Sequence, residues 1–353
     1  MTSSALETKP QITPQREEFY KRIDKKNATP LWEYLAELVT PEPRTPCVPA
    51  MWRYEEIRPL LMESGALITA KEAERRVLIL ENPGVRGASR ITQTLYAGLQ
   101  LVLPGEVAPT HRHTASALRF VIESDGGYTA VDGERTTMHA GDFIVTPSWT
   151  YHDHGNPGAG PVVWLDVLDI PLVNVLDTSF AEHYSGEEQP VTKKEGDSQA
   201  RFGANLLPVN YEPERRATPI FSYPYARTRE TLDWLAQNDS AHPCHGFKMR
   251  FANPADGGSP LPTIATFIQR LPGGFRGKTY RSTDATVYCV VEGSGRSQVG
   301  KESFEWKQHD VFVVPAWCPV SHHADRDTVL FSASDRPVQK MLGLWREQAP
   351  VAG

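Results

Sequence analysis

The chain has 353 residues, with 37 Lys and Arg against 43 Asp and Glu, so its formal net charge is −6. This length predicts about two domains of ~100–200 residues each. The acidic balance argues against nucleic acid as a partner, because there is no basic excess to neutralise phosphates. The most apolar stretch, residues 162–175, is interrupted by Asp166, Asp169 and Asn174 and is too short to span a membrane.

The N-terminus and the cysteines bear on the compartment. Residues 1–10 are small and polar, so we expect them to be disordered, and without a basic start or an apolar core they do not form a signal peptide. The four cysteines, at positions 47, 244, 289 and 318, are far apart and form no CxxC pair. This usage is typical of a reducing compartment, so we expect a cytoplasmic protein.

Helical signals occupy the first part of the chain. Two Thr-Pro pairs each place a capping hydroxyl before a proline, and they predict helices over 17–25 and 32–38. Thr69 and Glu72 form a capping-box pattern ahead of a further short helix. We therefore expect residues 1–76 to form an N-terminal helical segment.

Short strands and turns dominate the rest of the chain. Residues 77–80 are apolar and are closed by Asn82-Pro83-Gly84, which indicates a buried strand and a turn. From about residue 91, turn signals such as Asp132-Gly133 and Ala140-Gly141 recur between short apolar runs. Strands at this spacing are typical of a sandwich or barrel, so the fold is predicted to be mainly β.

An internal repeat divides the β region. A single shift of 168 residues superposes two segments that lie far apart in the chain. The matched pairs are Leu103 with Leu271, Asp142 with Asp310, Pro147 with Pro315 and Trp149 with Trp317. Such an offset indicates duplication of one β-domain. We expect the copies at 77–177 and 261–345, joined by a polar connector at 178–260 that contains one helix over 228–236.

The first copy contains two histidine motifs. Gly105-(x)5-His111-Arg112-His113 places two histidines at i and i+2, which point to the same face of a strand. Gly141-(x)5-Pro147 then leads to His152 and Asn156, far enough along the chain for strands to return to the same point. In spacing, these segments resemble the two motifs of the cupin superfamily.

The match departs from the cupin pattern in two places. The glutamate expected after the histidine pair is absent, and Arg119 follows the window where it would stand; the glycine expected after Pro147 is Trp149. Three neutral imidazoles leave a ferrous ion at net +2 rather than +1, which favours a chelating, dianionic substrate. An arginine beside the missing carboxylate suggests a substrate that carries a carboxylate.

Beyond these motifs, nearly the whole chain resembles the gentisate 1,2-dioxygenases and their salicylate and 1-hydroxy-2-naphthoate relatives. The matching segments are Thr29–Trp32, Glu72–Arg76, Glu81–Pro83, Pro109–Thr114, His152–Asn156, Trp164–Asp166 and Phe221–Tyr225. The resemblance implies a bicupin, that is, two double-stranded β-helix jelly-roll barrels after the N-terminal helical segment. It also implies a homotetramer.

The resemblance assigns roles to particular residues. The implied ligands of one Fe(II) per chain are His111, His113 and His152. Arg119 and one of the adjacent Arg75 and Arg76 would grip the substrate carboxylate. His154, oriented by Asp166, would hydrogen-bond the substrate and move protons. The residues expected to line the pocket, at alternating positions before the histidine pair, are Tyr96, Gly98 and Gln100.

The implied reaction opens gentisate with O₂ between its carboxyl- and hydroxyl-bearing carbons to give maleylpyruvate. The hydroxyl of Tyr96 offers a contact to the 5-hydroxyl of gentisate, which favours this substrate. Cleavage of salicylate or 1-hydroxy-2-naphthoate remains an alternative, as does a non-catalytic bicupin that binds a metal or ligand. In the second copy the ligand positions fall on Thr279, Arg281 and Val320, so we expect no second iron there and a structural role.

Overall fold

The computed structural model describes residues 12–350, and the expectations for residues 1–10 lie outside this range. The chain divides into two compact units, one up to Arg44 and one from Thr45 onward. Each is described by itself. No helix among the described residues is long and apolar enough to cross a membrane.

The first unit contains α1 (Pro14–Asp24) and α2 (Leu31–Leu38), which confirms the two predicted helices. Thr13 caps α1 as predicted, because its hydroxyl accepts a hydrogen bond from the Arg16 N–H at 3.3 Å. The matching prediction for Thr29 is wrong. Pro30 takes the N-cap position of α2, and no side chain caps this helix.

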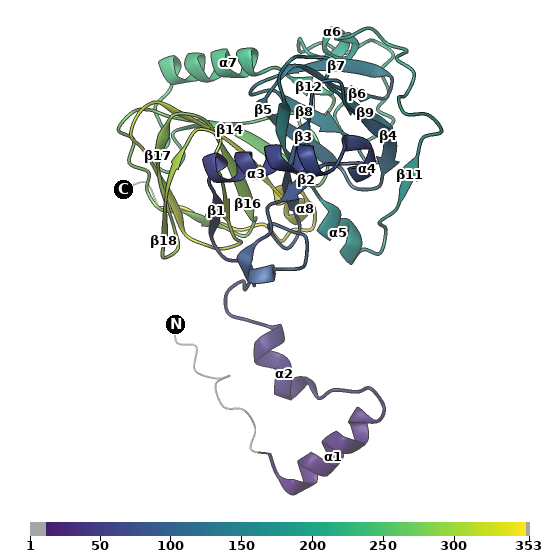
Figure 1. The fold of residues 1–353 in the computed structure, drawn as a ribbon. Helices are drawn as coiled ribbons and strands as arrows, with labels where there is room; N and C mark the ends of the chain where they lie inside the picture. Colours follow the sequence, from purple (N-terminus) through teal and green to yellow (C-terminus); the bar gives the residue numbers. More distant parts are fainter. Residues whose placement is uncertain (1–11, 351–353) are drawn as a thin grey trace. The chain divides into compact units, whose positions relative to one another are not determined.

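The second unit contains two β-barrels (Figure 1). The first barrel combines a sheet of order β12-β8-β5-β10-β3-β2 with a sheet of order β11-β4-β9-β6-β7. Its strands are β2 (Val77–Ile79), β3 (Tyr96–Val102), β4 (Val107–His113), β5 (Ala117–Glu123), β6 (Asp125–Val131), β7 (Glu134–His139), β8 (Phe143–Thr146), β9 (His152–Gly155), β10 (Val162–Leu168), β11 (Ala181–His183) and β12 (Ser222–Tyr223). The strand predicted at residues 77–80 is present as β2, but it lies at a sheet edge and is only partly buried, whereas the sequence predicted a buried strand.

The second barrel repeats this plan. Its main sheet has the order β1-β19-β16-β21-β14-β13, and a smaller sheet has the order β18-β17-β20. The strands are β1 (Ala50–Trp52), β13 (Phe247–Arg250), β14 (Ala265–Leu271), β16 (Thr286–Glu292), β17 (Ser294–Val299), β18 (Glu302–Lys307), β19 (Val311–Val314), β20 (Val320–Ala324) and β21 (Thr328–Ser334), with β15 (Arg281–Ser282) and β22 (Glu347–Gln348) as a separate pair. The predicted mainly-β duplication is thereby confirmed.

Helices and one 3₁₀ turn connect the strands. They are α3 (Tyr54–Leu67), α4 (Ala70–Ala73), η1 (Pro83–Val85), α5 (Ile170–Val175), α6 (Asp197–Phe202), α7 (Tyr225–Asn238) and α8 (Arg336–Met341). The capping box of Thr69 and Glu72 forms at α4 as predicted. Helix α7 is the helix predicted in the connector. Helix α3 was not predicted, because it lacks a side-chain cap and contains Pro59.

Two strands cross from one barrel to the other. Strand β1 precedes the first barrel in the chain but pairs with β19 of the second, and β12 precedes the second barrel but pairs with β8 of the first. In Figure 1, β1 accordingly lies among the strands of the second barrel. The predicted boundaries therefore do not separate independent pieces. The segment 1–76 and the connector 178–260 both contribute strands to the barrel sheets.

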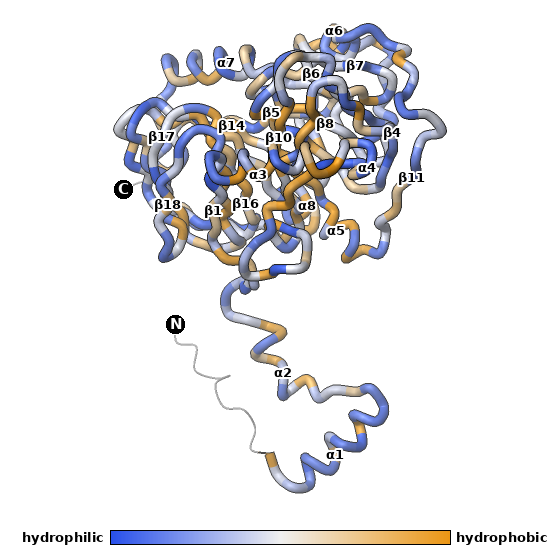
Figure 2. The backbone as a smooth tube through the Cα atoms, viewed as in Figure 1, coloured by the Kyte–Doolittle hydropathy of each residue, from blue (hydrophilic) through white to orange (hydrophobic). Residues whose placement is uncertain are grey.

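The main hydrophobic core lies where the large sheets of the two barrels face each other. Alternate residues of β3, β5 and β10 meet alternate residues of β16 and β21 in one cluster. The rings of Phe120 and Phe331 stack across it at 4.3 Å between centroids. The tube in Figure 2 is orange along these strands. The opposite faces of the same strands point into the barrels, where the polar residues lie.

Candidate metal centre and substrate pocket

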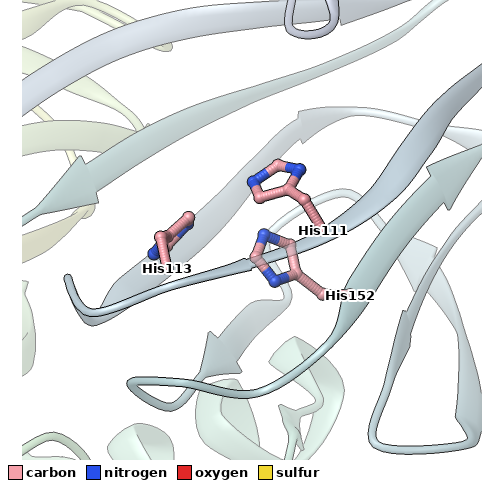
Figure 3. Close-up of side chains that lie close together, drawn as sticks. All are labelled: His111, His113 and His152. Atoms are coloured by element: carbon pink, nitrogen blue, oxygen red, sulfur yellow. The ribbon is translucent and has the colours of Figure 1, made fainter. Parts of the chain in front are cut away.

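Three histidines meet inside the first barrel. His111 and His113 lie on β4, and His152 begins β9, directly opposite His111 in the antiparallel register. The ring centroids are 4.5 Å apart for His111 and His152, 4.9 Å for His113 and His152, and 5.2 Å for His111 and His113. Figure 3 shows the three rings gathered at one point. Among the described residues they form the one group able to hold a metal ion.

The backbone orients two of these rings. Nδ1 of His113 lies 2.8 Å from the Ala115 carbonyl, and Nδ1 of His152 lies 3.0 Å from the Thr150 carbonyl. Because a carbonyl only accepts, both Nδ1 atoms carry the proton, which leaves both Nε2 lone pairs free for a metal. Burial lowers the pKa of His113 to about 4 and that of His152 well below its usual range. The imidazoles are therefore neutral, as ligation requires, and the residues present fit a divalent metal.

The structure distinguishes the two adjacent arginines. Nη2 of Arg75 lies 2.7 Å from Nδ1 of His111 and donates to the Pro109 carbonyl at 3.0 Å. Arg76 instead forms an ion pair with Glu106 outside the centre. Burial and the neighbouring Arg119 lower the pKa of Arg75 to about 9. Arg75 is therefore the member of the pair that faces the histidines, a choice that the sequence left open.

Arg119 lies in the same interior on β5. It faces Asp166 across the β5–β10 pairing, with 3.6 Å between Nε and Oδ1, and its Nη1 donates to the Thr146 hydroxyl at 2.6 Å. Both charged side chains are less than a tenth exposed. Burial raises the pKa of Asp166 to about 6, although Arg119 opposes the shift. The two groups form a buried ion pair beside the histidines.

His154 does not have the partner expected from the sequence. Asp166 pairs with Arg119, and Nδ1 of His154 lies 3.0 Å from the Thr129 hydroxyl. Thr129 stands opposite His154 in the β6–β9 register, a pairing that no local sequence pattern marks. Nε2 of His154 is buried and has no hydrogen-bond partner among the described residues. It is therefore open to a bound molecule.

Strand β3 places the three remaining predicted residues on the interior face. Leu99 and its alternate neighbours point into the core between the barrels, so Tyr96, Gly98 and Gln100 point the other way. Gly98 is opposite Asp166 on β10. A Cβ at Gly98 would lie 2.4 Å from a methyl group of Val77, so this position has no room for a side chain. The amide nitrogen of Gln100 is buried without a partner among the described residues.

Known proteins share this architecture. A family model described as a cupin domain matches residues 98–168. The chain is 56% identical over 339 residues to gentisate 1,2 dioxygenase 1 of Aquipseudomonas alcaligenes, covering 96% of this chain and 98% of that protein. It is 38% identical over 331 residues to the 5-aminosalicylate 1,2-dioxygenase of Comamonas sp., covering 92% and 88%.

Among solved structures, the salicylate 1,2-dioxygenase of Pseudoaminobacter salicylatoxidans, determined as adducts with gentisate, has a TM-score of 0.93 at 32% identity. That similarity covers 99% of this chain and 98% of the other. The cupin fold predicted from the two histidine motifs is thereby confirmed.

Proposed function

The chain belongs to the gentisate 1,2-dioxygenase family, and from this premise we propose that it opens gentisate with O₂ between the carboxyl- and hydroxyl-bearing carbons to give maleylpyruvate. The observation that carries the proposal is the buried histidine centre with two arginines and an unpartnered histidine nitrogen around it. Such a set binds a metal, a carboxylate and a hydroxyl at once. The 56% identity with a gentisate 1,2 dioxygenase supports the same substrate.

We propose Fe(II) as the metal, held by His111, His113 and His152. When bound, the ferrous ion would supply the redox chemistry that joins O₂ to the ring. The protein contributes three neutral ligands and no carboxylate, so the centre keeps its positive charge for an anionic substrate. The barrel around it supplies the binding and orientation of the organic substrate.

Arg75 and Arg119 would bind the substrate carboxylate. Both guanidinium groups lie inside the barrel, and arginine forms paired hydrogen bonds with a carboxylate. Asp166 and Thr146 hold Arg119 in place, which limits its loss of side-chain entropy when the substrate binds. Burial and the neighbouring Arg119 both lower the pKa of Arg75, so a substrate carboxylate between the two arginines would offset their repulsion.

His154 would accept a hydrogen bond from the substrate hydroxyl. The Thr129 hydroxyl donates to the thioether sulfur of Met138 at 3.2 Å, so its oxygen accepts from Nδ1 of His154. This arrangement puts the ring proton on Nδ1 and leaves Nε2 as the acceptor. Burial lowers the pKa of His154 well below its usual range, which keeps the ring neutral and able to accept.

The test is anaerobic reconstitution with Fe(II), followed by gentisate and air in an oxygen electrode. We expect one O₂ consumed per gentisate and the ultraviolet absorbance of an enol-ketoacid product. The matched control is His111→Ala, which should bind no iron and consume no O₂. Iron bound at one per chain without O₂ uptake would contradict the proposal and favour a metal-binding bicupin. A panel with salicylate, 5-aminosalicylate and 1-hydroxy-2-naphthoate would identify the preferred ring.

Tyr96 is proposed to read the 5-hydroxyl of gentisate. Burial raises the pKa of its phenol, and Asp166 adds to the shift, so the hydroxyl stays neutral and available as a hydrogen-bond donor. We expect Tyr96→Phe to lower kcat/KM for gentisate about tenfold while that for salicylate changes little, because salicylate lacks this hydroxyl. Steady-state kinetics with both substrates measure the ratio. An unchanged ratio would remove Tyr96 from substrate selection.

We also propose that the chain acts as a homotetramer in the cytoplasm. The family resemblance suggests the assembly. Four free cysteines, three of them buried, suit a reducing compartment. Light scattering after size-exclusion chromatography measures the mass, and a monomer or dimer would contradict the tetramer.

A further inference from the structure

The second barrel, whose metal-ligand positions hold Thr279, Arg281 and Val320, has a mostly apolar interior that also contains a few buried polar side chains. Gln269 on β14 and Ser332 on β21 share the inward face with Leu271 and Leu330, and both are fully buried. Neither the amide of Gln269 nor the hydroxyl of Ser332 has a hydrogen-bond partner among the described residues, and the same holds for Nε2 of His322 on β20. Buried polar atoms in native proteins are nearly always paired, so a group absent from the chain is expected to meet them.

A lysine faces these groups. Lys248 on β13 is directly opposite Gln269, and its ammonium lies 4.9 Å from the ring centroid of Phe267 and 5.7 Å from that of Tyr288. No carboxylate among the described residues forms an ion pair with it. Burial lowers the pKa of Lys248 to about 7, and Arg336 adds to the effect.

Arg336 cannot share its counter-ion with Lys248. Its guanidinium also lies 4.9 Å from the Phe267 ring, so two cations gather around one phenyl group. Asp284, the buried carboxylate nearby, is bonded to Arg336 Nε at 3.1 Å and to Trp345 Nε1 at 2.8 Å. Lys248 therefore has no ion-pair partner of its own among the described residues, although Asp284 and Glu347 favour its charged form from a distance.

The duplication relates this interior to the substrate pocket of the first barrel. The strands β3 and β14, β9 and β20, and β6 and β17 correspond to one another in the two copies. By the offset of 168 residues His322 corresponds to His154, and Gln269 lies one position beyond the counterpart of Gln100. Ser297 takes the place of Thr129, with 2.8 Å between its hydroxyl and Nδ1 of His322. The second copy thus lost the metal ligands but kept polar groups that face an organic ligand.

A surface pocket of about 290 Å³ adjoins this interior. Its lining includes Thr279 and Arg281, the counterparts of the first two metal ligands, and Tyr280 between them. The Tyr280 hydroxyl lies 2.9 Å from that of Tyr288, whose ring borders Lys248. Tyr280 therefore lies between the surface pocket and the ring that borders Lys248.

We propose that the second barrel is a metal-independent binding site for a small carboxylate anion. Lys248 neutralises the carboxylate, and Gln269 and Ser332 donate hydrogen bonds to it. The rings of Phe267 and Tyr288 contact its carbon skeleton. The site is separate from ring cleavage and does not require it.

The test is equilibrium dialysis of radiolabelled benzoate against the iron-loaded full chain under anaerobic conditions, with unlabelled acetate as competitor. We expect Lys248→Met to bind one equivalent of benzoate per chain fewer than wild type, with at least a tenfold loss of affinity at that site. The control Lys301→Met alters an exposed lysine on the same barrel and should keep every equivalent. Turnover of gentisate should be unchanged in both variants, which separates this outcome from any failure of the proposed function.

Gln269→Leu provides a second, independent variant. Because this variant removes two unpaired polar atoms, it should have a higher Tm than wild type in the absence of benzoate. It should also lose the increase in Tm that benzoate causes in wild type by binding at Lys248. Equal numbers of bound equivalents in wild type and Lys248→Met would overturn the proposal. A benzoate-induced rise in Tm that is as large in both variants as in wild type would also overturn it. Binding of inorganic sulfate, with no binding of benzoate or acetate, would overturn it as well.

Discussion

Single hydrogen bonds set the chemistry of the first barrel. The ring of His154 presents Nε2 as a hydrogen-bond acceptor only if its proton stays on Nδ1, and the Met138–Thr129–His154 series of contacts fixes this tautomer. Because the thioether sulfur of Met138 can only accept, the Thr129 hydroxyl donates to it, and the Thr129 oxygen accepts from Nδ1 of His154. Thr129 is therefore a positioning residue that acts through His154.

Substitution of Thr129 tests this assignment. We expect Thr129→Val, which keeps the shape but removes the hydroxyl, to lower kcat for gentisate about tenfold with little change in KM or iron content. Thr129→Ser keeps the hydroxyl and should restore most of the rate. Steady-state kinetics and iron analysis of the two variants provide the comparison. Equal rates for Thr129→Val and wild type would show that the ring is oriented without the hydroxyl.

Asp166 predicts a pH effect on stability. Its pKa in the folded chain is about 6, raised above the ordinary aspartate value of 3.8 chiefly by burial. A carboxyl with a raised folded pKa takes up a proton in the folded state first, so its contribution to stability increases as the pH falls from about 7 to about 4.

Urea unfolding of the metal-free protein measures this contribution. Between pH 7 and pH 4.5, wild type should gain about 2 kcal/mol relative to Asp166→Asn, because this pH range covers most of the interval between the folded and unfolded pKa values. A difference between the two proteins that stays constant with pH would contradict the raised pKa. Protonation also weakens the hold on Arg119, so the same acidification should reduce substrate binding.

The sequence alone was informative about residues with a local pattern. His111, His113 and His152 follow from strand alternation and motif spacing, and the structure brings them together. The contact between Thr129 and His154 depends on the register of two strands 25 residues apart, which no local pattern specifies. The expected partner Asp166 was therefore wrong, although Asp166 does lie in the same interior.

At the scale of elements, each exchanged strand is followed by a helix, and an aspartate of the barrel that receives the strand binds the start of that helix. Asp310 accepts hydrogen bonds from the N–H groups of Tyr54 at 2.8 Å and Lys307 at 3.0 Å, so an aspartate of the second barrel holds the start of α3. Asp142 of the first barrel accepts from the Tyr225 N–H at 2.8 Å, at the start of α7. The repeat pointed to these two aspartates without showing their partners, which lie in distant parts of the chain.

Removal of one such aspartate should destabilise the fold. Asp310→Ala leaves one buried and one partly buried N–H group without an acceptor, so we expect a loss of about 1–3 kcal/mol in the free energy of unfolding. Asp310→Asn keeps one acceptor oxygen and should lose about half as much. Urea denaturation of both variants, with exposed Asp325→Ala as control, measures the differences. A loss below about 0.5 kcal/mol for Asp310→Ala, the range of ordinary surface substitutions, would show that α3 is held by other contacts.

At the scale of the whole molecule, the unit from Thr45 onward joins two barrels that complete each other's sheets. The constant offset of 168 residues predicted the duplication, but the exchange of β1 and β12 could not be read from it. A strand pairs through its backbone, so an exchanged strand has the same hydrophobic pattern as one that stays with its own barrel. The shared core of Phe120 and Phe331 adds a second link between the barrels.

These links predict a single unfolding transition for both barrels. Because neither barrel has a complete main sheet without the other, calorimetry should show one cooperative transition in the metal-free protein. The proposed Fe(II) would bind in the first barrel, yet at 100 times its Kd it should stabilise the whole transition by about 2.7 kcal/mol. If the barrels unfolded independently, Fe(II) would raise the Tm of one transition, which carries about half of the unfolding enthalpy, and the Tm of the other transition would not change. Two separated transitions in the iron-loaded protein would therefore contradict the structural coupling of the barrels.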